Sequence, residues 1–124
     1  MHFALLVLYL QRIKILSMNY SQVIDNIKKV AHRVLPSGSS LYLYGSRARG
    51  DASEGSDWDL LLLIDQPHAS YKEKESLEFP FVDMGWTIGE DISARAYTKD
   101  QWYHSPHTMF YFNVEQDKQL LYES

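Results

Sequence analysis

The sequence predicts an α/β (α+β) domain in which a small mixed β-sheet is flanked by helices. Its 124 residues fit one domain, which we expect to span residues 18–124. Apolar residues at helical spacing alternate along the chain with short runs of β-forming residues. One run, residues 58–64, is apolar almost without interruption, which is typical of a central strand buried on both faces.

The first predicted element is a helix from Ser21 to Leu35. Asn19 or Ser21 can cap its start, and Pro36 with Gly38 ends it. Its apolar residues form one continuous stripe, while the charged residues lie opposite. The stripe consists of Val23, Ile24, Ile27, Val30, Ala31, Val34 and Leu35.

Two strands are predicted next. Residues 41–44 are rich in β-formers and end at Gly45, and residues 58–64 follow a turn punctuated by glycines. Residues 70–88 then carry apolar side chains at helical intervals, which predicts a helix kinked or broken around Pro80.

A third strand is predicted at residues 92–98. Alternation places Ser93, Arg95 and Tyr97 on one face of it. For the tail, residues 106–122, we expect a helix that packs through Phe110, Val114 and Leu121. The expected order is therefore helix, strand, strand, helix, strand, helix.

Residues 1–17 are interpreted as an uncertain extension. The apolar stretch is too short to span a bilayer, and no basic leader precedes it. We favour translation from Met18, with residues 1–17 as upstream sequence or an optional element.

The composition restricts the functional classes. The net charge is -4, with no basic run, so binding to nucleic acid is not indicated. The chain has no cysteine, which excludes disulfides and thiolate metal sites and fits the cytoplasm. A chain this short leaves apolar surface that a partner or a second copy can cover.

Asp57 and Asp59 are the strongest candidates for a metal site. Residues two apart on a strand point to the same face, so the two carboxylates converge. Such a pair repels unless a cation neutralises it, and Mg²⁺ prefers hard oxygen ligands of this kind.

The turn that begins at Gly45 and Ser46 is a candidate phosphate site. Glycine allows close approach of the backbone, and the Ser46 amide and hydroxyl can donate hydrogen bonds to phosphate oxygens. A helical turn over residues 46–50 would add a favourable dipole. Arg47 and Arg49 could clamp a phosphate, although exposed arginines need no such role.

Gly45-Ser46, ten residues, then Asp57-Trp58-Asp59 resemble the signature of the nucleotidyltransferase fold shared with DNA polymerase beta, in its minimal, stand-alone branch. The resemblance implies that Gly45 and Ser46 bind the triphosphate and that Asp57 and Asp59 hold Mg²⁺. It further implies transfer of a nucleoside monophosphate from an NTP, with ATP favoured, to an acceptor hydroxyl. Minimal members pair with helical HEPN-type proteins as toxin–antitoxin systems, so a protein acceptor is plausible.

The sequence departs from this family at the third carboxylate, which active members carry on a neighbouring strand. The predicted strand offers Ser93 or Arg95 instead of an acid. Asp91, just before it, is the best candidate for a third catalytic carboxylate, ahead of Glu90 and Asp83. The alternative function is a catalytically weak or inactive module that binds nucleotide or protein.

Other residues give weaker signals. His104 and His107 flank Pro106 without further ligands, which favours a helix-entry role over a metal site. Asp51 and Glu54 are expected to be solvated loop acids. Several aromatic residues are more typical of a core or a protein interface than of a base-stacking surface. They are Trp86, Trp102, Tyr103, Phe110, Tyr111 and Phe112.

Overall fold

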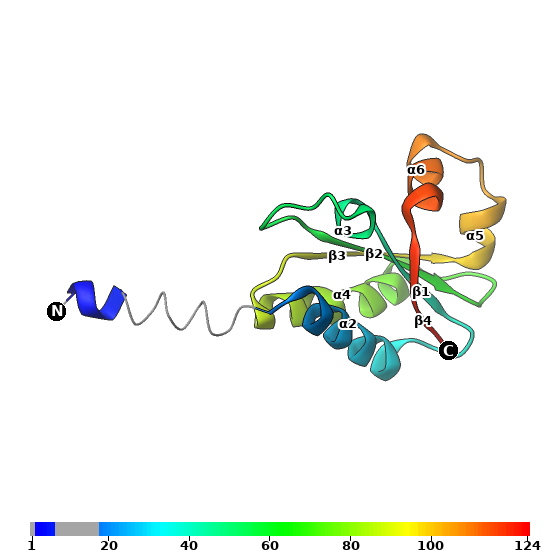
Figure 1. Cartoon of the computed structure of the whole chain (residues 1–124). Coiled ribbons are helices and arrows are strands. Elements are labelled where there is room, and N and C mark those ends of the chain that lie inside the picture. The colour runs from blue at the N-terminus through cyan, green and yellow to red at the C-terminus, as the bar shows by residue number, and fades with distance from the viewer. Residues whose placement is uncertain (1, 7–17) are drawn as a thin grey trace.

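The computed structural model describes residues 2–6 and 18–124 (Figure 1). Residues 2–6 are helical and exposed, whereas Met1 and residues 7–17, which complete the predicted extension, lie outside the described residues. The main elements are α2 (Tyr20–Val34), β1 (Ser40–Tyr44), α3 (Ser46–Arg49), β2 (Trp58–Ile64), α4 (Tyr71–Ile88), β3 (Ile92–Thr98), α5 (Lys99–His104), α6 (Met109–Asp117) and β4 (Gln119–Glu123). No helix in the described ranges is long and apolar enough to cross a membrane.

The sheet has four strands in the order β3-β2-β1-β4. β1 runs antiparallel to both β2 and β4, whereas β2 and β3 are parallel and connected by α4. The sheet is therefore mixed, as the sequence predicts. β2 lies centrally and is buried over five consecutive residues, which explains its unbroken apolar run.

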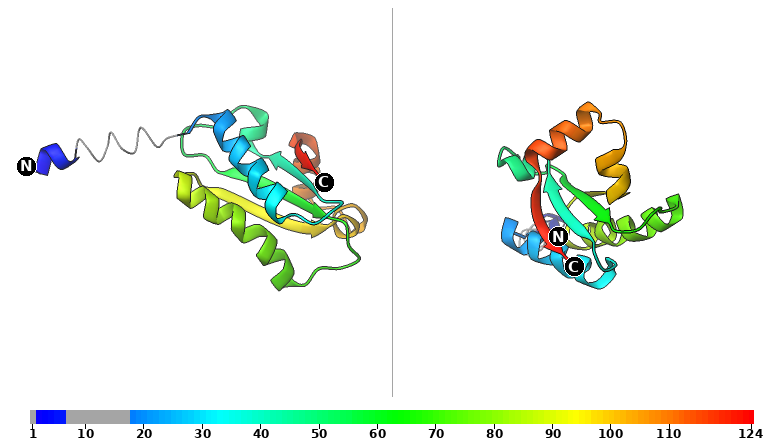
Figure 2. Two further views of the ribbon diagram at one scale, coloured as in Figure 1. Left: turned by 90° about the horizontal axis from the view of Figure 1, so that it is seen from below. Right: turned by 90° about the vertical axis from the view of Figure 1, so that its right-hand side faces the viewer.

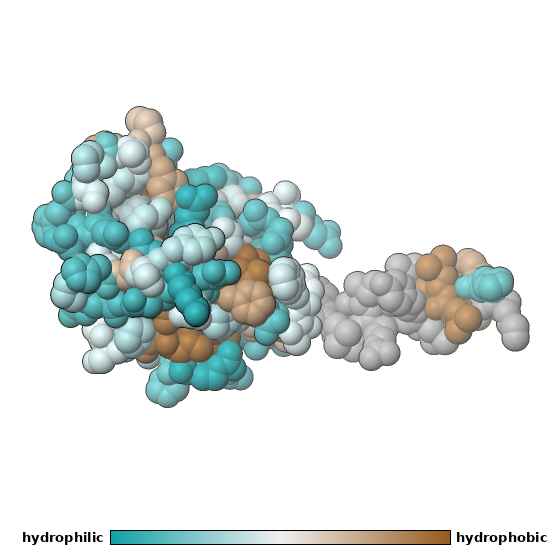
Figure 3. Space-filling model, turned by 180° about the vertical axis from the view of Figure 1, so that it is seen from behind, coloured by the Kyte–Doolittle hydropathy of each residue, from teal (hydrophilic) through white to brown (hydrophobic). Residues whose placement is uncertain are grey.

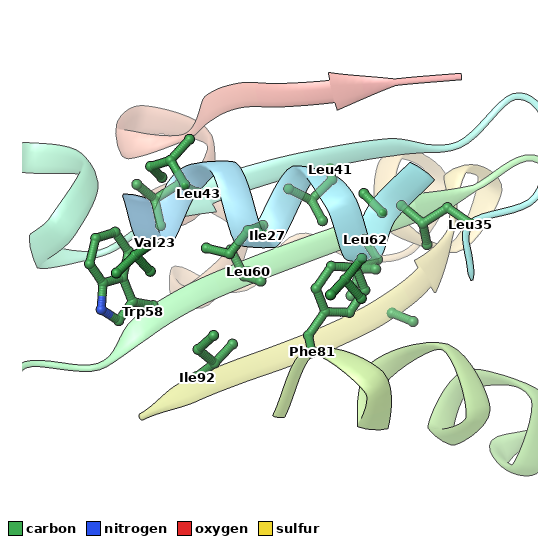
Figure 4. Close-up of a cluster of buried hydrophobic side chains, with 14 of the residues drawn as sticks. Val23, Ile27, Leu35, Leu41, Leu43, Trp58, Leu60, Leu62, Phe81 and Ile92 are labelled. Carbon is green, nitrogen blue, oxygen red and sulfur yellow. The ribbon is translucent and has the colours of Figure 1, made fainter. Parts of the chain in front are cut away.

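Helices α2 and α4 cover one face of the sheet (Figure 2). α2 begins with a capping box between Asn19 and Gln22, which satisfies free amides of its first turn. Its apolar stripe packs on alternate residues of the strands, with Phe81 of α4 completing the layer (Figure 4). Because these helices close this face, functional side chains on the sheet have to point to the other one.

Helices α5 and α6 pack against the opposite face, where Trp102 and Val114 are buried with Leu61 and Leu63. The Trp102 ring lies between the rings of Tyr97, Phe110 and Tyr111, at centroid distances of 5.1, 6.0 and 5.1 Å. Three of the six aromatics expected in a core or interface therefore build this second core.

The prediction for the tail was wrong. Residues 106–122 do not form one helix, because α6 ends at Asp117 and β4 pairs with the free edge of β1. Pairing with an open strand edge outweighs the local helical pattern in residues 119–123. The sequence prediction also missed α5, although Thr98 and Gln101 form a capping box that a T-x-x-Q pattern signals.

Helix α4 runs through Pro80 to Ile88, so of the predicted kink or break at Pro80 the break is wrong. Phe81 and Gly85 are buried on either side of the next turn, so packing stabilises the helix despite the lost hydrogen bond. A side chain on Gly85 would meet the carbonyl of Glu90 and the side chain of Ile92. Close contact with β3 therefore holds the second half of the helix in place.

Apolar patches remain among the polar residues on the rear surface (Figure 3). On α4, Phe79 and Trp86 are 51% and 65% exposed and contact each other edge to face. Phe3, Leu5 and Leu6 of the N-terminal turn are also exposed. Trp86 is thus a surface residue rather than part of the core.

Candidate active site

The phosphate-site candidate and the carboxylates meet where β1 ends. Tyr44, the last residue of β1, lies opposite Asp59 in the antiparallel register, and Gly45 and Ser46 follow directly. Gly45 has φ 75°, a value that favours glycine. A Cβ at Gly45 would overlap the Asp59 carboxylate, so the absence of a side chain lets the turn touch this residue.

The short helix α3 begins at Ser46, as the sequence suggested. The Gly45 carbonyl accepts hydrogen bonds from the amides of Ala48 and Arg49, at 3.1 and 3.0 Å. The amides that precede these two in the first turn of a helix have no carbonyl of the same helix to which they can donate. The amides of Ser46 and Arg47 therefore remain available to an anion beside Asp59.

Asp57, Asp59 and Asp91 come together at the N-terminal ends of β2 and β3. The Trp58 amide donates to the Asp91 carbonyl at 2.9 Å, and this hydrogen bond joins the start of β2 to the residue before β3. A hydrogen bond between the carboxyl groups of Asp57 and Asp91 raises the pKa of Asp57, and the negative charge of Asp91 raises it further. Asp91 thus adjoins Asp57, and its role as a third catalytic carboxylate stays a prediction.

Burial is the main cause of a raised pKa at Asp59, followed by the charge of Asp57. Arg95 and Arg49 oppose this rise. Burial and the charge of Asp59 also raise the pKa of Tyr44 to about 12. The site is therefore short of positive charge, and a cation would stabilise it.

Arg47 ties the phosphate-site turn to the strand that carries the carboxylates. Its guanidinium donates to the Ser56 carbonyl through Nε (3.3 Å) and Nη2 (3.0 Å). It also lies over the Trp58 ring, 4.6 Å from the centroid. These contacts give Arg47 a positioning role, and a direct contact with phosphate stays a prediction.

Arg49 is exposed and joins α3 to α6. Its Nε pairs with Asp51 at 3.1 Å and its Nη1 with Asp117 at 2.8 Å. The Gln119 amide donates to the Ala48 carbonyl at 2.7 Å. Asp117 and Gln119 thus support the turn, and no local sequence signal points to either because both contacts are long-range.

The two weaker candidates for the third carboxylate lie elsewhere. Glu90 accepts a hydrogen bond from the Trp58 indole at 3.1 Å, on the helix-covered side. Asp83 is exposed on α4. Of the three acids considered from the sequence, only Asp91 adjoins the Asp57 carboxyl group.

The two histidines are separate from these carboxylates. His104 pairs with Asp100 at 2.9 Å, and His107 stacks on Tyr111 with 3.7 Å between ring centroids. His107 also contacts the Tyr103 carbonyl at 3.1 Å. The arrangement agrees with a local structural role. Glu54 lies exposed in the loop before β2.

The carboxylates suit Mg²⁺ by their chemistry, because they are hard oxygen donors whose repulsion a divalent cation relieves. Within the described ranges, no group of three or more His, Cys, Asp or Glu side chains is placed to hold a metal ion. Mg²⁺ is usually held by one or two protein carboxylates together with substrate phosphates and water.

The family model of the nucleotidyltransferase domain matches residues 24–118, so the chain belongs to this family. The bifunctional uridylyltransferase/uridylyl-removing enzyme of Burkholderia thailandensis is 32% identical over 78 residues, which cover 62% of this chain and 9% of that enzyme. Its Burkholderia mallei counterpart is 37% identical over 67 residues, or 54% of this chain and 8% of that enzyme. The chain therefore spans under a tenth of these curated relatives.

Solved structures share the fold. A chain in the crystal structure of a toxin–antitoxin with AMP-PNP superposes with a TM-score of 0.59 at 18% identity, covering 82% of this chain and 73% of that one. A chain from the tri-AMPylated Shewanella oneidensis HEPN toxin in complex with MNT antitoxin gives 0.56 at 15% identity, covering 84% and 72%. The expected nucleotidyltransferase fold is thereby confirmed.

Proposed function

We propose that this protein is a Mg²⁺-dependent nucleotidyltransferase that moves a nucleoside monophosphate from an NTP, with ATP favoured, to an acceptor hydroxyl. One observation carries the proposal. The register between Tyr44 and Asp59 sets the Gly45-Ser46 turn against a pair of carboxylates that Asp91 adjoins. The proposed phosphate and metal sites would therefore share one location, which supports this activity in a chain of the nucleotidyltransferase family.

In the proposed reaction, the acceptor oxygen forms a bond to the α-phosphorus. The bond from the α-phosphorus to the oxygen bridging to the β-phosphate breaks, and pyrophosphate leaves. Gly45 and Ser46 orient the phosphate chain through backbone amides, and Asp91 accepts the proton of the hydroxyl. Catalysis consists mostly of positioning and charge stabilisation.

Asp57 and Asp59 are the residues that would hold Mg²⁺. The ion would neutralise charge that develops on the phosphate oxygens and on the leaving pyrophosphate. Without it, the two aspartates would repel the substrate. The raised pKa values of both carboxyl groups fit residues that need a cation beside them.

For the acceptor we propose a protein hydroxyl, on a small helical HEPN-type partner. The toxin–antitoxin structures that share the fold support such a pairing. The chain has no cysteine, and we expect this reaction in the cytoplasm, where NTPs are available. A second copy of the chain is the other candidate for the partner.

A nucleotide-binding module without turnover is the second candidate function. It is favoured by Ser93, which lies beside Asp59 in the register where an acid would be expected. Under this alternative Asp91 would not act as a base. Nucleotide would then bind, but no nucleotidyl group would reach any acceptor.

The first test is calorimetric titration of ATP and GTP into the purified protein, with Mg²⁺ and with EDTA. We expect binding that requires Mg²⁺ and disappears in an Asp57→Ala/Asp59→Ala variant. Glu54→Ala is the matched control, since this acid is exposed in the loop before β2. Absence of binding to the unaltered protein under all these conditions would contradict both proposed functions.

Transfer is tested separately, with ATP labelled at the α-phosphate and a HEPN-type protein from the same organism as acceptor. We expect the label on the acceptor with the unaltered chain and none with Asp91→Asn. Retained Mg²⁺-ATP binding in Asp91→Asn would show that the site is intact. Binding without label in the unaltered protein would favour the non-catalytic module.

A further inference from the structure

A hollow of about 310 Å³ opens on the same side of the sheet as the carboxylates. Tyr97, Trp102, Phe110 and Tyr111 provide aromatic walls, and Lys74 reaches it from α4. This volume lies at the lower end of the range for small-molecule sites. The hollow does not include any residue of the phosphate or metal site.

A row of β3 side chains leads from the carboxylates to this hollow. Ser93 lies beside Asp59, and Arg95 and Tyr97 follow at alternate positions on the same face. At about 3.3 Å per residue, Ser93 and Tyr97 are about 13 Å apart. Phe110 lies between the two regions, with its ring 5.8 Å from Tyr44 and also in the wall of the hollow.

The chemistry of the lining suits a heteroaromatic ring. Aromatic side chains stack on the faces of bases. Lys74 lies 5.7 Å from the Tyr97 ring centroid and, in the part of the chain that is described, has no acid within ion-pair distance. Its ammonium group and the Ser105 hydroxyl can donate to ring nitrogens or to a carbonyl oxygen.

We propose that this hollow binds the nucleobase of the NTP, while its phosphates lie at Gly45 and the aspartates. This inference rests on the proposed function. The ribose would then lie over Arg95, which is held on the Phe110 ring at 5.0 Å and influences Asp59 through its charge. The hollow thus acts as a base subsite, built by α5, the α5–α6 connection and α6 against the end of β3.

The test separates the base from the phosphates by using three probes, Mg²⁺-ATP, inorganic tripolyphosphate with Mg²⁺, and adenosine. Lys74→Ala is the variant, and Lys72→Ala on the same helix is the control that does not line the hollow. We expect Lys74→Ala to weaken ATP binding by about threefold to tenfold, as for one lost hydrogen bond. Tripolyphosphate binding should stay unchanged, and Lys72→Ala should affect neither.

Phe110→Leu provides a second variant, because it removes stacking while keeping an apolar side chain. A loss of ATP affinity of at least about fivefold is expected from base–aromatic stacking, again with tripolyphosphate unaffected. Its thermal unfolding is measured first to show that the second core is intact. If it does not fold, the comparison of the two lysine variants decides the question.

Adenosine gives a readout that needs neither metal nor phosphates. Added to the full chain, it should shift the NMR signal of the Trp102 indole N–H, because the Trp102 side chain lines the hollow. No shift, or an equal effect of Lys74→Ala on ATP and on tripolyphosphate, would overturn the base subsite. A shift of the Trp102 indole signal with adenosine, without Mg²⁺-dependent binding of ATP or tripolyphosphate, would instead contradict the proposed function but not the binding of a base in the hollow.

Discussion

At the scale of a single residue, Gly45 links the candidate phosphate site to the candidate metal site. Its φ of 75° belongs to the left-handed region, and a Cβ there would overlap the carboxylate of Asp59. Gly50, five residues later, has a similar φ of 83°, but a Cβ at that position would meet nothing within 4 Å. Substitutions at the two glycines therefore distinguish the effect of backbone strain from the effect of steric contact with the Asp59 carboxylate.

Replacement of Gly45 by alanine should displace Asp59. We expect Gly45→Ala to lose at least about tenfold in Mg²⁺-ATP affinity and about 1–2 kcal/mol of stability, since the left-handed conformation costs that much for other residues. Gly50→Ala should lose similar stability but retain binding. Calorimetric titration and urea unfolding measure both effects, and equal ATP affinity in the two variants would contradict the expected role.

Asp59 should lower the stability of the metal-free protein. Its pKa is raised in the folded state, chiefly by burial, so the unfolded chain ionises first. Below pH 3.8, the ordinary pKa of this group, the protonated Asp59 carboxyl group makes its full contribution to stability. This contribution is lost as the pH rises through the higher pKa of Asp59 in the folded state, so the ionised group leaves the protein less stable. Asp59→Asn should therefore raise the Tm by a few degrees at pH 7 without metal.

Mg²⁺ should reverse this order, because it stabilises the unaltered protein and not Asp59→Asn. Thermal unfolding followed by circular dichroism, with Mg²⁺ and with EDTA, checks both statements. Glu54→Gln is the control, since Glu54 is exposed in the loop before β2. A lower Tm for Asp59→Asn at neutral pH without metal would refute the argument.

At the scale of elements, α4 protects the exposed edge of the sheet. β3 is an edge strand, and the Ala96 amide donates to the Glu78 carboxylate at 2.7 Å. At the end of the strand, the Thr98 amide donates to the side chain of Gln101 at 3.2 Å. Side chains thus occupy edge positions that another strand would otherwise pair with.

Glu78→Ala should therefore destabilise the domain by about 1–3 kcal/mol, because it leaves the part-buried Ala96 amide without its charged acceptor. Glu78→Gln retains an acceptor oxygen and should lose less. Glu75→Ala, exposed on the same helix, should change little. Urea unfolding curves give the three values, and equal stabilities of the Glu75 and Glu78 variants would argue against the edge contact.

The elements differ in how well the sequence predicts them. Residues 58–64 and 92–98 were predicted with their observed bounds, because burial leaves a strong local pattern. The tail failed, since Gln119–Glu123 becomes a strand only through pairing with β1. In the candidate site, Gly45 and Asp59 are adjacent because of the strand register, and the spacing of the motif indicates this. The contact of Arg49 with Asp117 joins residues 68 positions apart, so no local sequence pattern indicates it.

At the scale of the whole molecule, the helices cover the two faces of the sheet unequally, and this leaves the candidate site accessible. α2 and α4 close one face, while α5 and α6 pack over the other beside Leu61, Leu63 and Tyr97. Asp57 and Asp91 remain exposed at the opposite end of the same strands. The contacts of α6 and β4 with α3 join the two ends, so the second core also supports the phosphate-site turn.

The extent of the domain gives the last prediction. Residues 2–6 are exposed, whereas Met18 packs against the core and its sulfur accepts a contact from the Asn26 amide at 3.5 Å. Asn19 then supplies the capping box of α2. A protein that begins at Met18 should therefore keep the Tm and the Mg²⁺-ATP affinity of the full chain.

A protein that begins at Tyr20 should differ, because it loses both Met18 and the cap. Loss of an N-cap alone costs about 1 kcal/mol, which for a domain of this size corresponds to a Tm lower by about 4 °C. Thermal unfolding of the full chain and of both shortened proteins makes the comparison. If the protein that begins at Met18 also melts several degrees lower, residues 1–17 contribute to the fold, and the domain has to be extended to include them.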